Sequence, residues 1–396
     1  MTVSTSRVTG LLDAAAGDLQ THFRRCGPVP WGRPDLIGDL RAAGLTGRGG
    51  GGFPVWRKLA TVARGRAPVV IANGAEGEPA SHKDDTLLRR APHLVLDGLQ
   101  LAAETVRAGQ AYLYTPPGPA MAAVKAALAE RAARGWDAIA VSLVATPDSF
   151  LGGEESAVVA AVEGRPARPG DRFELTARSG VDGRPTLVQN VETLAQLALI
   201  ARCGPSWFRE RGTEREPGTM LTTLSGSVRE PGVYEVPIGT PLGHVLARAG
   251  GPARPLCALL VGGYHGTWVP ATALASPFSR AGLGAVGAGV VIALDTGQCG
   301  LWAAAGVANY LAQQSARQCG PCLNGLPAIA DAMARLARGG TPDLPERLHR
   351  LTALVEGRGA CHHPDGTARF VRSALAVFDD EVARHLRGDC VTRRTR

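Results

Sequence analysis

The chain has 396 residues, 45% of them hydrophobic and 20% charged, so it can bury ordinary cores and is long enough for two or three domains. Its longest apolar run, residues 281–294, is glycine-rich and shorter than the roughly 20 residues a membrane helix needs, which excludes a membrane span. The net charge of +8 comes from scattered basic residues that rarely neighbour aromatics, so we expect no nucleic-acid partner, and the polar start without a leader pattern predicts a cytoplasmic protein.

A glycine-rich loop follows the first strongly patterned helix. Leu36, Ile37 and Leu40 lie at helical spacing within residues 34–44, so we expect a helix there. The next segment, Gly47–Pro54, places four consecutive glycines beside one arginine, which leaves backbone N–H groups free to wrap a phosphate. The segment also matches G-x-G-x-x-G, but the dinucleotide fingerprint needs a strand directly before it. The loop therefore predicts a nucleotide or flavin site outside a conventional Rossmann unit.

An α/β pattern extends from residue 69 to residue 145. An apolar strand at 69–72 leads into the irregular segment Asn73–Pro79, where α/β sheets commonly present ligand-binding groups. Further strands are predicted at 110–114 and 138–145, and helices at about 94–108 and 118–134. This alternation favours a largely parallel sheet. Of only three lysines in the chain, Lys58 and Lys83 lie beside the two glycine segments, which is suggestive of a site that uses a compact ammonium group.

Two further polar segments follow the predicted sheet strands. Gly153, Glu154 and Glu155 precede a helix predicted at 156–163. Adjacent acids at a helix start suit carboxylates aimed at a ligand, and they equally suit simple N-terminal capping. Asn190–Thr193 begins the next helix, to about residue 201.

The second half of the chain changes from strands to helices. A short mixed β-α-β module is predicted after residue 218, with a helix that begins at Pro241 and is capped by Thr240. Its strands are expected at 220–228, 233–236 and 258–261, and four later helices at 300–315, 322–338, 344–356 and 366–387. Apolar spacings of three and four in those helices are typical of a four-helix bundle.

Eight cysteines occur, and most are dispersed as buried small hydrophobes would be. Cys319-x-x-Cys322 is the exception, at a predicted helix junction, with Cys361 at the next junction but one.

With these segments in order, the chain resembles the flavin-carrying NADH-dehydrogenase subunit of respiratory complex I and its relatives in NAD-linked hydrogenases and formate dehydrogenases. The family's Gly-Arg-Gly-Gly-Ala-Gly-Phe-Pro stands here as Gly47–Pro54, and its Asn-Ala-Asp-Glu-Gly-Glu-Pro as Asn73–Pro79. Its Gly-Glu-Glu is Gly153–Glu155, and its Asn-Asn-Val-Glu-Thr is Gln189–Thr193.

The resemblance implies an α/β fold class with three functional parts. These are an FMN- and NADH-binding α/β domain at 34–215, a small β-grasp (SLBB) module at 216–296 and a helical iron–sulfur domain at 297–396, after an N-terminal extension at 1–33. It places FMN against Gly47, Arg48, Gly49, Gly50, Gly51, Gly52, Lys58, Asn73, Glu76, Gly153, Glu154, Gln189 and Asn190. It places NADH against Phe53, Glu78 and Glu155.

The sequence also departs from the family pattern. Ala75 replaces the family's aspartate, Gln189 replaces its first asparagine, and Thr61 stands where the family has an aromatic residue. Ala316 replaces the first cysteine of Cys-x-x-Cys-x-x-Cys, which with a distant fourth cysteine binds a 4Fe-4S cluster in the family.

Three kinds of metal site remain open at Cys319, Cys322 and Cys361. They are a 4Fe-4S cluster with a replacement ligand such as His362 or His363, a zinc site of Cys3His type, and a site that holds no metal. Cys299 and Cys390 are outside candidates for the missing ligand.

The implied function is an FMN-dependent, NADH dehydrogenase-like oxidoreductase that passes electrons through an iron–sulfur centre. The implied partners are NADH and ferredoxin-like or other electron-transfer subunits, with docking to a membrane complex left open. The rival hypothesis is an electron-transfer or assembly subunit that keeps the fold but has lost NADH oxidation.

Overall fold

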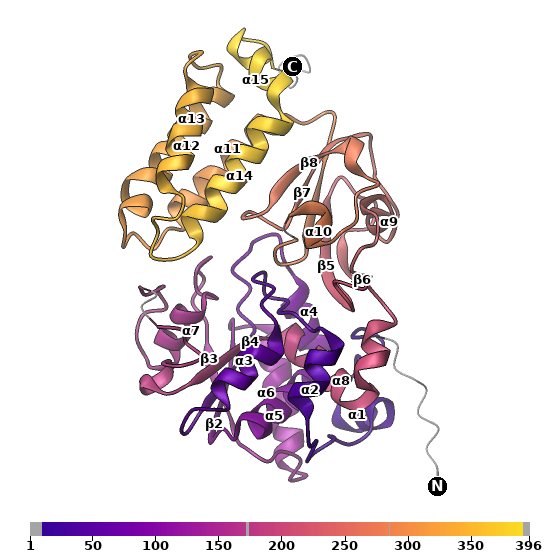
Figure 1. Ribbon diagram of the computed structural model, residues 1–396. Helices are drawn as coiled ribbons and strands as arrows, with labels where there is room; N and C mark the ends of the chain where they lie inside the picture. The colour runs from indigo at the N-terminus through magenta and orange to yellow at the C-terminus, as the bar shows by residue number, and fades with distance from the viewer. Residues whose placement is uncertain (1–9, 172–173, 285, 391–396) are drawn as a thin grey trace. The chain divides into compact units, whose positions relative to one another are not determined.

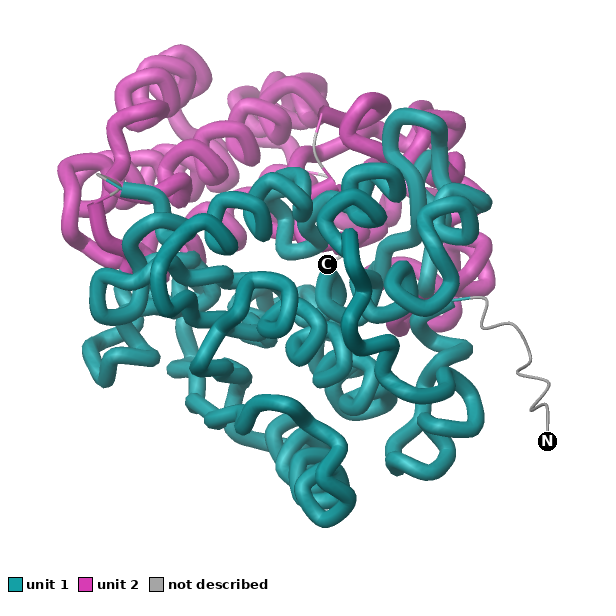
Figure 2. The backbone as a smooth tube through the Cα atoms, turned by 60° about the horizontal axis from the view of Figure 1, so that its bottom comes forward, with its two compact units in different colours: residues 1–168, 173–222, 235–239 teal, residues 169–172, 223–234, 240–396 magenta. Residues whose placement is uncertain are grey.

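The computed structural model describes residues 10–171, 174–284 and 286–390 (Figure 1). They divide into two compact units, coloured separately in Figure 2. Unit 1 consists of residues 1–168, 173–222 and 235–239, and unit 2 of residues 169–172, 223–234 and 240–396.

Unit 1 is built on a four-stranded parallel sheet with the strand order β3-β2-β1-β4. Its strands are β1 (Val69–Asn73), β2 (Gln110–Thr115), β3 (Val141–Ala145) and β4 (Thr186–Asn190). The predicted parallel α/β architecture is therefore confirmed. β2 and β3 are added on one side of β1 and β4 on the other, so the strand order reverses between β1 and β4. Ligands of open α/β sheets bind at such a switch point, beyond the carboxyl ends of the strands.

The helices of unit 1 pack tightly around this sheet. They are α1 (Leu19–Cys26), α2 (Leu36–Ala43), α3 (Val55–Val62), α4 (Lys83–Arg90), α5 (Pro92–Val106), α6 (Pro119–Ala132), α7 (Glu155–Val162), the 3-10 turn η1 (Val181–Gly183) and α8 (Val191–Arg209). α5 lies against α8 so closely that a Cβ atom at Gly98 would be 2.0 Å from the carbonyl oxygen of Leu194. α2 ends at Gly44 directly before the glycine loop, as the sequence predicts.

A second sheet, with the strand order β6-β5-β9-β7-β8, follows in the chain. Its elements are β5 (Thr219–Gly226), β6 (Gly232–Pro237), α9 (Leu242–Ala247), β7 (Leu256–Val261), β8 (Thr267–Pro270), η2 (Ala271–Ala273), α10 (Arg280–Leu283) and β9 (Val290–Asp295). β5 pairs with β9 in parallel, whereas β7 is antiparallel to both of its neighbours. The sequence predicts neither β8 nor β9. In the case of β9, the preceding glycines interrupt the apolar pattern of the strand.

The predicted cap of α9 is wrong. Pro241 is the N-cap residue and makes no side-chain cap hydrogen bond. The helix therefore begins one residue later than the sequence predicts, and the predicted cap, Thr240, lies outside it.

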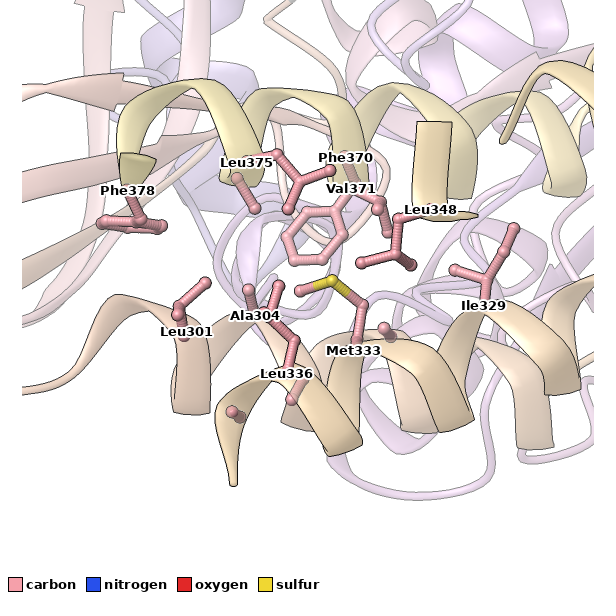
Figure 3. Close-up of a cluster of buried hydrophobic side chains, with 14 of the residues drawn as sticks. Leu301, Ala304, Ile329, Met333, Leu336, Leu348, Phe370, Val371, Leu375 and Phe378 are labelled. Atoms are coloured by element: carbon pink, nitrogen blue, oxygen red, sulfur yellow. The ribbon is translucent and has the colours of Figure 1, made fainter. Parts of the chain in front are cut away.

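The described chain after β9 is mainly helical. Its elements are α11 (Gly300–Gln313), the π-helical turn η3 (Pro321–Gly325), α12 (Leu326–Ala337), α13 (Leu344–Val355), α14 (His363–Val377) and α15 (Asp379–Leu386). Phe370, Met333 and Leu336 meet in its buried core (Figure 3). Among the described residues, the structure contains no helix with both the length and the hydropathy needed to span a membrane.

The final predicted helix is two helices, which separate at Phe378. The backbone of Phe378 is not helical, at φ −108° and ψ 29°. Its ring packs edge-on against Trp268, with 5.0 Å between the ring centroids. The ring also covers Gly300, where a Cβ atom would be 2.3 Å from the nearest ring atom. We attribute the break to this packing, which holds the ring at the start of α11.

Candidate functional site

The glycine loop is a short hairpin between α2 and α3. Thr46 and Pro54 form an antiparallel bridge at its base, and the N–H of Gly47 donates to the carbonyl of Phe53 at 3.0 Å. Gly50 and Gly52 have φ values of 101° and 60°, which residues with side chains rarely adopt. The base is closed by protein hydrogen bonds, and the tip requires glycine.

The loop lies against the carboxyl ends of β1 and β4. Asn73 and Asn190 are paired at the last register position of these strands. A Cβ atom at Gly49 would be 3.3 Å from the Cβ of Asn190, which places the loop beside the strand end. The side chain of Asn73 donates to the carbonyl of Gly153 at 2.9 Å. The four motifs therefore converge at the switch point of the sheet.

A buried ionic network supports the carboxyl end of β4. The ammonium of Lys83 lies 2.8 Å from a carboxylate oxygen of Glu192 and 3.0 Å from one of Asp84. Burial alone would lower the pKa of Lys83, but the two carboxylates more than offset that effect and raise it. Asn190 donates to Asp84 at 2.7 Å, which connects the network to the end of β4.

The rarity of lysine marks Lys83 in the sequence, but the sequence predicts no role for Asp84 or Glu192. The charged run that starts at Lys83 and the glutamate after Asn190 were the available signals. A sequence does not show which carboxylates a buried ammonium will meet.

Several predicted cofactor-binding side chains are already bonded to the protein. Lys58 pairs with Glu155 and donates to the carbonyl of Val188 at 2.7 Å. Glu154 caps α7 by accepting from the N–H groups of Ser156 and Ala157. The capping alternative for Glu154 is thus observed, and Glu155 faces a lysine instead.

Glu76 is held at the start of α4. Its carboxylate accepts from the hydroxyl of Ser81 at 2.6 Å and from the N–H groups of Asp84 and Asp85 at 3.1 and 3.0 Å. Burial raises its pKa, and the nearby Asp84 adds to the rise.

Arg48, Gln189 and Phe53 occupy different environments. Arg48 is buried, and its guanidinium donates to the hydroxyl of Thr46 at 3.0 Å and to the carbonyl of Pro217 at 3.3 Å. Gln189 is also buried. The Phe53 side chain is exposed, as a residue that faces a transient dinucleotide would be.

The loop fits a phosphate-bearing cofactor. A Cβ atom at Gly51 would meet no atom of the described residues within 4 Å, so this position faces open space. Successive glycine N–H groups next to such a space form an anion-binding concavity. The residues present therefore suit the phosphate of FMN.

The other predicted site lies in unit 2. Cys319 precedes η3, Cys322 lies within it, and Cys361 precedes α14. Burial raises the pKa of Cys322 to about 12, and its hydrogen bond with Cys319 and the nearby thiol of Cys361 add to the rise. The three thiols are therefore neighbours, beside a cavity of about 590 Å³ that Cys322 helps to line.

The three predicted thiols do not form a compact group of three ligand atoms. Within the described part of the chain, Cys299, His385 and Cys390 are the group that brings three metal-ligand atoms within 4.8 Å of one another. The thiols of Cys319, Cys322 and Cys361 do not meet that spacing, although ligands of one tetrahedral zinc ion would.

His362 and His363, the two histidines predicted as replacements for the missing cysteine ligand, differ in their surroundings. His363 is buried, and its ring nitrogens lie 2.8 Å from the carbonyl oxygen of Leu311 and 2.9 Å from His265. Burial lowers the pKa of His363 to about 4. His362 is exposed, with Nδ1 3.0 Å from Asp365.

Cys299 and Cys390, the outside candidates, lie elsewhere in unit 2. Their neighbour His385 bonds to the carbonyl of Ala337, the last residue of α12, whereas Cys322 lies just before the start of that helix. At 1.5 Å per helical residue the two groups are about 20 Å apart.

A site for a phosphate-bearing cofactor and a set of clustered thiols in one chain define the class of the protein. Such a pairing is typical of flavin- and iron–sulfur-dependent electron-transfer oxidoreductases, in which an organic cofactor and a metal cluster exchange electrons.

Comparison with known proteins gives the family. Three family models match: the Nuo51 FMN-binding domain at residues 40–199, the SLBB domain at 221–257 and the NADH-ubiquinone oxidoreductase-F iron-sulfur binding region at 302–385. The second F subunit of NADH-quinone oxidoreductase from Rhizobium meliloti (strain 1021) is 33% identical over 89% of each chain. The F subunit from Streptomyces coelicolor is 30% identical over 89% of this chain and 83% of its own. The chain belongs to this family of NADH-quinone oxidoreductase F subunits, as its motifs predict.

A solved structure is also similar to this chain, in agreement with the family assignment. An NAD+-reducing NiFe-hydrogenase, in its H2-reduced state, matches with a TM-score of 0.85 and 31% sequence identity over 90% of this chain. This chain spans 64% of the length of that hydrogenase chain. These relatives do not favour the rival hypothesis of a subunit without NADH oxidation.

Proposed function

We propose that the chain is the NADH-oxidising, FMN-binding subunit of a larger electron-transfer assembly. The observation that carries the proposal is the convergence of the glycine loop with Asn73 and Asn190 at the switch point of the parallel sheet. With its cofactors bound, such a subunit would connect NADH, FMN and a 4Fe-4S-type centre to a protein or quinone-linked acceptor.

Each part of the flavin site has a proposed role. The N–H groups of the loop bind the FMN phosphate, while Lys58 and the amides of Asn73 and Asn190 complete the shell. Arg48 and Gln189 shape the loop and the strand end from buried positions. The remaining proposed contacts to FMN are Glu76, Gly153 and Glu154, and those to NADH are Phe53, Glu78 and Glu155.

A bound FMN would accept a hydride and release electrons singly. The chain's own residues bind, orient and shield. The rigid hairpin base and the buried Lys83–Glu192 pair fix the position of Asn190 before a ligand arrives. The exposed ring of Phe53 would be accessible to a nicotinamide. Preorganised donors of this kind cost no reorganisation during the reaction.

Cys319, Cys322 and Cys361 are the proposed cluster ligands. A fourth ligand to such a cluster would have to come from outside these thiols, and His362 suits this role better than His363. Both ring nitrogens of His363 already have protein partners, whereas His362 is exposed at the helix start.

The family names imply partner subunits, and we extend this to ferredoxin-like electron carriers. Docking to a membrane complex is compatible with the proposal, and the proposed location is the cytoplasm.

An anaerobic titration tests the function. The FMN-loaded chain is titrated with NADH while flavin absorbance is followed at about 450 nm, which we expect to bleach with one equivalent. Phe53→Ala should weaken the apparent NADH affinity but retain flavin, and exposed Phe23→Ala is a matched control. Persistent flavin absorbance with excess NADH, in protein that dithionite still reduces, would overturn NADH oxidation.

A further inference from the structure

A second group of metal-ligand side chains lies at the far end of the helical bundle. The Sγ atoms of Cys299 and Cys390 and a ring nitrogen of His385 lie within 4.8 Å of one another, and all three residues are buried. Cys299 precedes α11, His385 lies on α15, and Cys390 follows α15. The group therefore joins the last described helix to the start of α11.

The histidine is oriented as a metal ligand would be. Its Nδ1 lies 2.8 Å from the carbonyl oxygen of Ala337. A carbonyl can only accept, so the proton of the neutral ring is on Nδ1 and the lone pair of Nε2 faces the Sγ of Cys299, 3.3 Å away. Metal-bound histidines typically donate their other N–H to such a partner.

A carboxylate completes the surroundings. Oε2 of Glu381 lies 3.3 Å from the Sγ of Cys299 and accepts from the N–H of Gly300 at 2.8 Å. Glu381 is itself buried.

We propose that Cys299, His385 and Cys390 bind one zinc ion, with Glu381 or a water molecule as the fourth ligand. Zinc takes thiolate and imidazole ligands in a tetrahedron, whose ligand atoms lie about 3.3 to 3.8 Å apart at ordinary bond lengths. The observed spacing of Cys299 and His385 falls in that range.

The charges and protons balance. Zinc binding displaces one proton from each thiol, and the two thiolates neutralise the charge of the ion. Neutral imidazole and a water ligand add no charge, whereas Glu381 as the fourth ligand gives the site one net negative charge, and no electron is transferred.

This site is separate from the proposed iron–sulfur site. α12 lies between the two groups, and its length sets them about 20 Å apart. The zinc ion would be structural, fixing α15 and Cys390 to the start of α11. The inference does not rest on the proposed electron transfer.

Metal analysis of the full chain tests the proposal. The protein is purified anaerobically from zinc-supplemented cells, and zinc and iron are measured by mass spectrometry. We expect about one zinc per wild-type chain. The C299S/C390S variant should lose zinc and keep flavin, whereas C319S/C322S should lose iron and keep zinc. C26S/C203S is the matched control, because Cys26 and Cys203 are a neighbouring pair in unit 1.

Three results would overturn the zinc site. They are less than about a tenth of an equivalent of zinc in wild type, zinc unchanged in C299S/C390S, and a Cys299–Cys390 disulfide found by peptide mass spectrometry. If C299S/C390S is insoluble, zinc-edge X-ray absorption of wild type decides. Two sulfur ligands at about 2.3 Å support the proposal, whereas three or more contradict it.

Discussion

Two regions of the molecule depend on different kinds of ligand-binding group. The flavin region is formed by the glycine loop and the ends of β1 and β4. The cysteine region is formed by Cys319, Cys322 and Cys361. The flavin region relies mainly on backbone N–H groups and on side chains already held by the protein. The cysteine region relies on individual thiols.

This difference explains how each region tolerates sequence change. At Ala75 and Gln189 the family's side chains are replaced, yet the hairpin, the strand register and the buried network remain in place. At Ala316 a thiolate is lost, and no backbone group can replace it as an iron ligand. A site built from main-chain donors is therefore less sensitive to substitution than a site built from metal ligands.

The largest expected effect is on the support of the flavin region. Lys83→Met leaves the carboxylate of Glu192 buried without its ammonium partner, which should lower the free energy of unfolding by about 3–5 kcal/mol. Urea unfolding, monitored through the release of flavin, measures this change in the free energy of unfolding. Lys125→Met, on the exposed face of α6, should change stability by less than about 0.5 kcal/mol. Equal effects of the two substitutions would show that the network does not support the site.

The second prediction separates fold from ligand binding. Gly51→Val adds a side chain where the protein leaves open space, so the chain should fold while flavin affinity falls by at least about 100-fold. Fluorescence titration with FMN measures the affinity. Gly109→Val, at an exposed glycine that is also free of close neighbours, is the control. Unchanged FMN binding by the Gly51 variant would place the phosphate elsewhere.

The third prediction sharpens the contrast by repairing the cysteine region. Ala316→Cys restores the thiolate at family spacing, so we expect the cluster to survive air several times longer than in wild type, with about four irons per chain. Loss of visible iron–sulfur absorbance with time measures its lifetime. Gln318→Cys adds an exposed thiol in the same loop at the wrong spacing and should give no protection. Equal protection by both variants would mean that position 316 is not a ligand position.

The smallest expected effect is the loss of folding stability at acidic pH, which we assign to His93. Burial, with the nearby His22 and Arg131, lowers the pKa of His93 in unit 1 to about 4 from its ordinary 6.5. The unfolded chain therefore binds a proton below pH 6.5 that the folded chain does not, and stability falls as the pH falls from 6.5 toward 4. We expect a loss on the order of 2 kcal/mol, reduced in His93→Gln. Urea unfolding at several pH values measures it, and an identical pH profile for both proteins would contradict the assignment.

The sequence predicts how the flavin motifs come together better than it predicts long-range contacts between buried side chains. The Gly47–Pro54 and Asn73–Pro79 motifs are local, and a parallel sheet brings strand ends to one edge, so their convergence follows from topology. The partners of Lys83 and the approach of His385 to Cys299 could not be predicted in this way. The Lys83–Glu192 pair and the Cys299–His385 contact join residues that are 109 and 86 positions apart in the chain.

The most direct test of the central claim follows one electron path in a single chain. The FMN-loaded protein is mixed anaerobically with NADH, frozen, and measured by electron paramagnetic resonance alongside Cys322→Ser. We predict a reduced iron–sulfur signal in wild type and none in the variant, with the flavin bleached in both. Bleached flavin in wild type without any iron–sulfur signal, in protein whose cluster dithionite reduces, would contradict electron transfer from the flavin to the cysteine region.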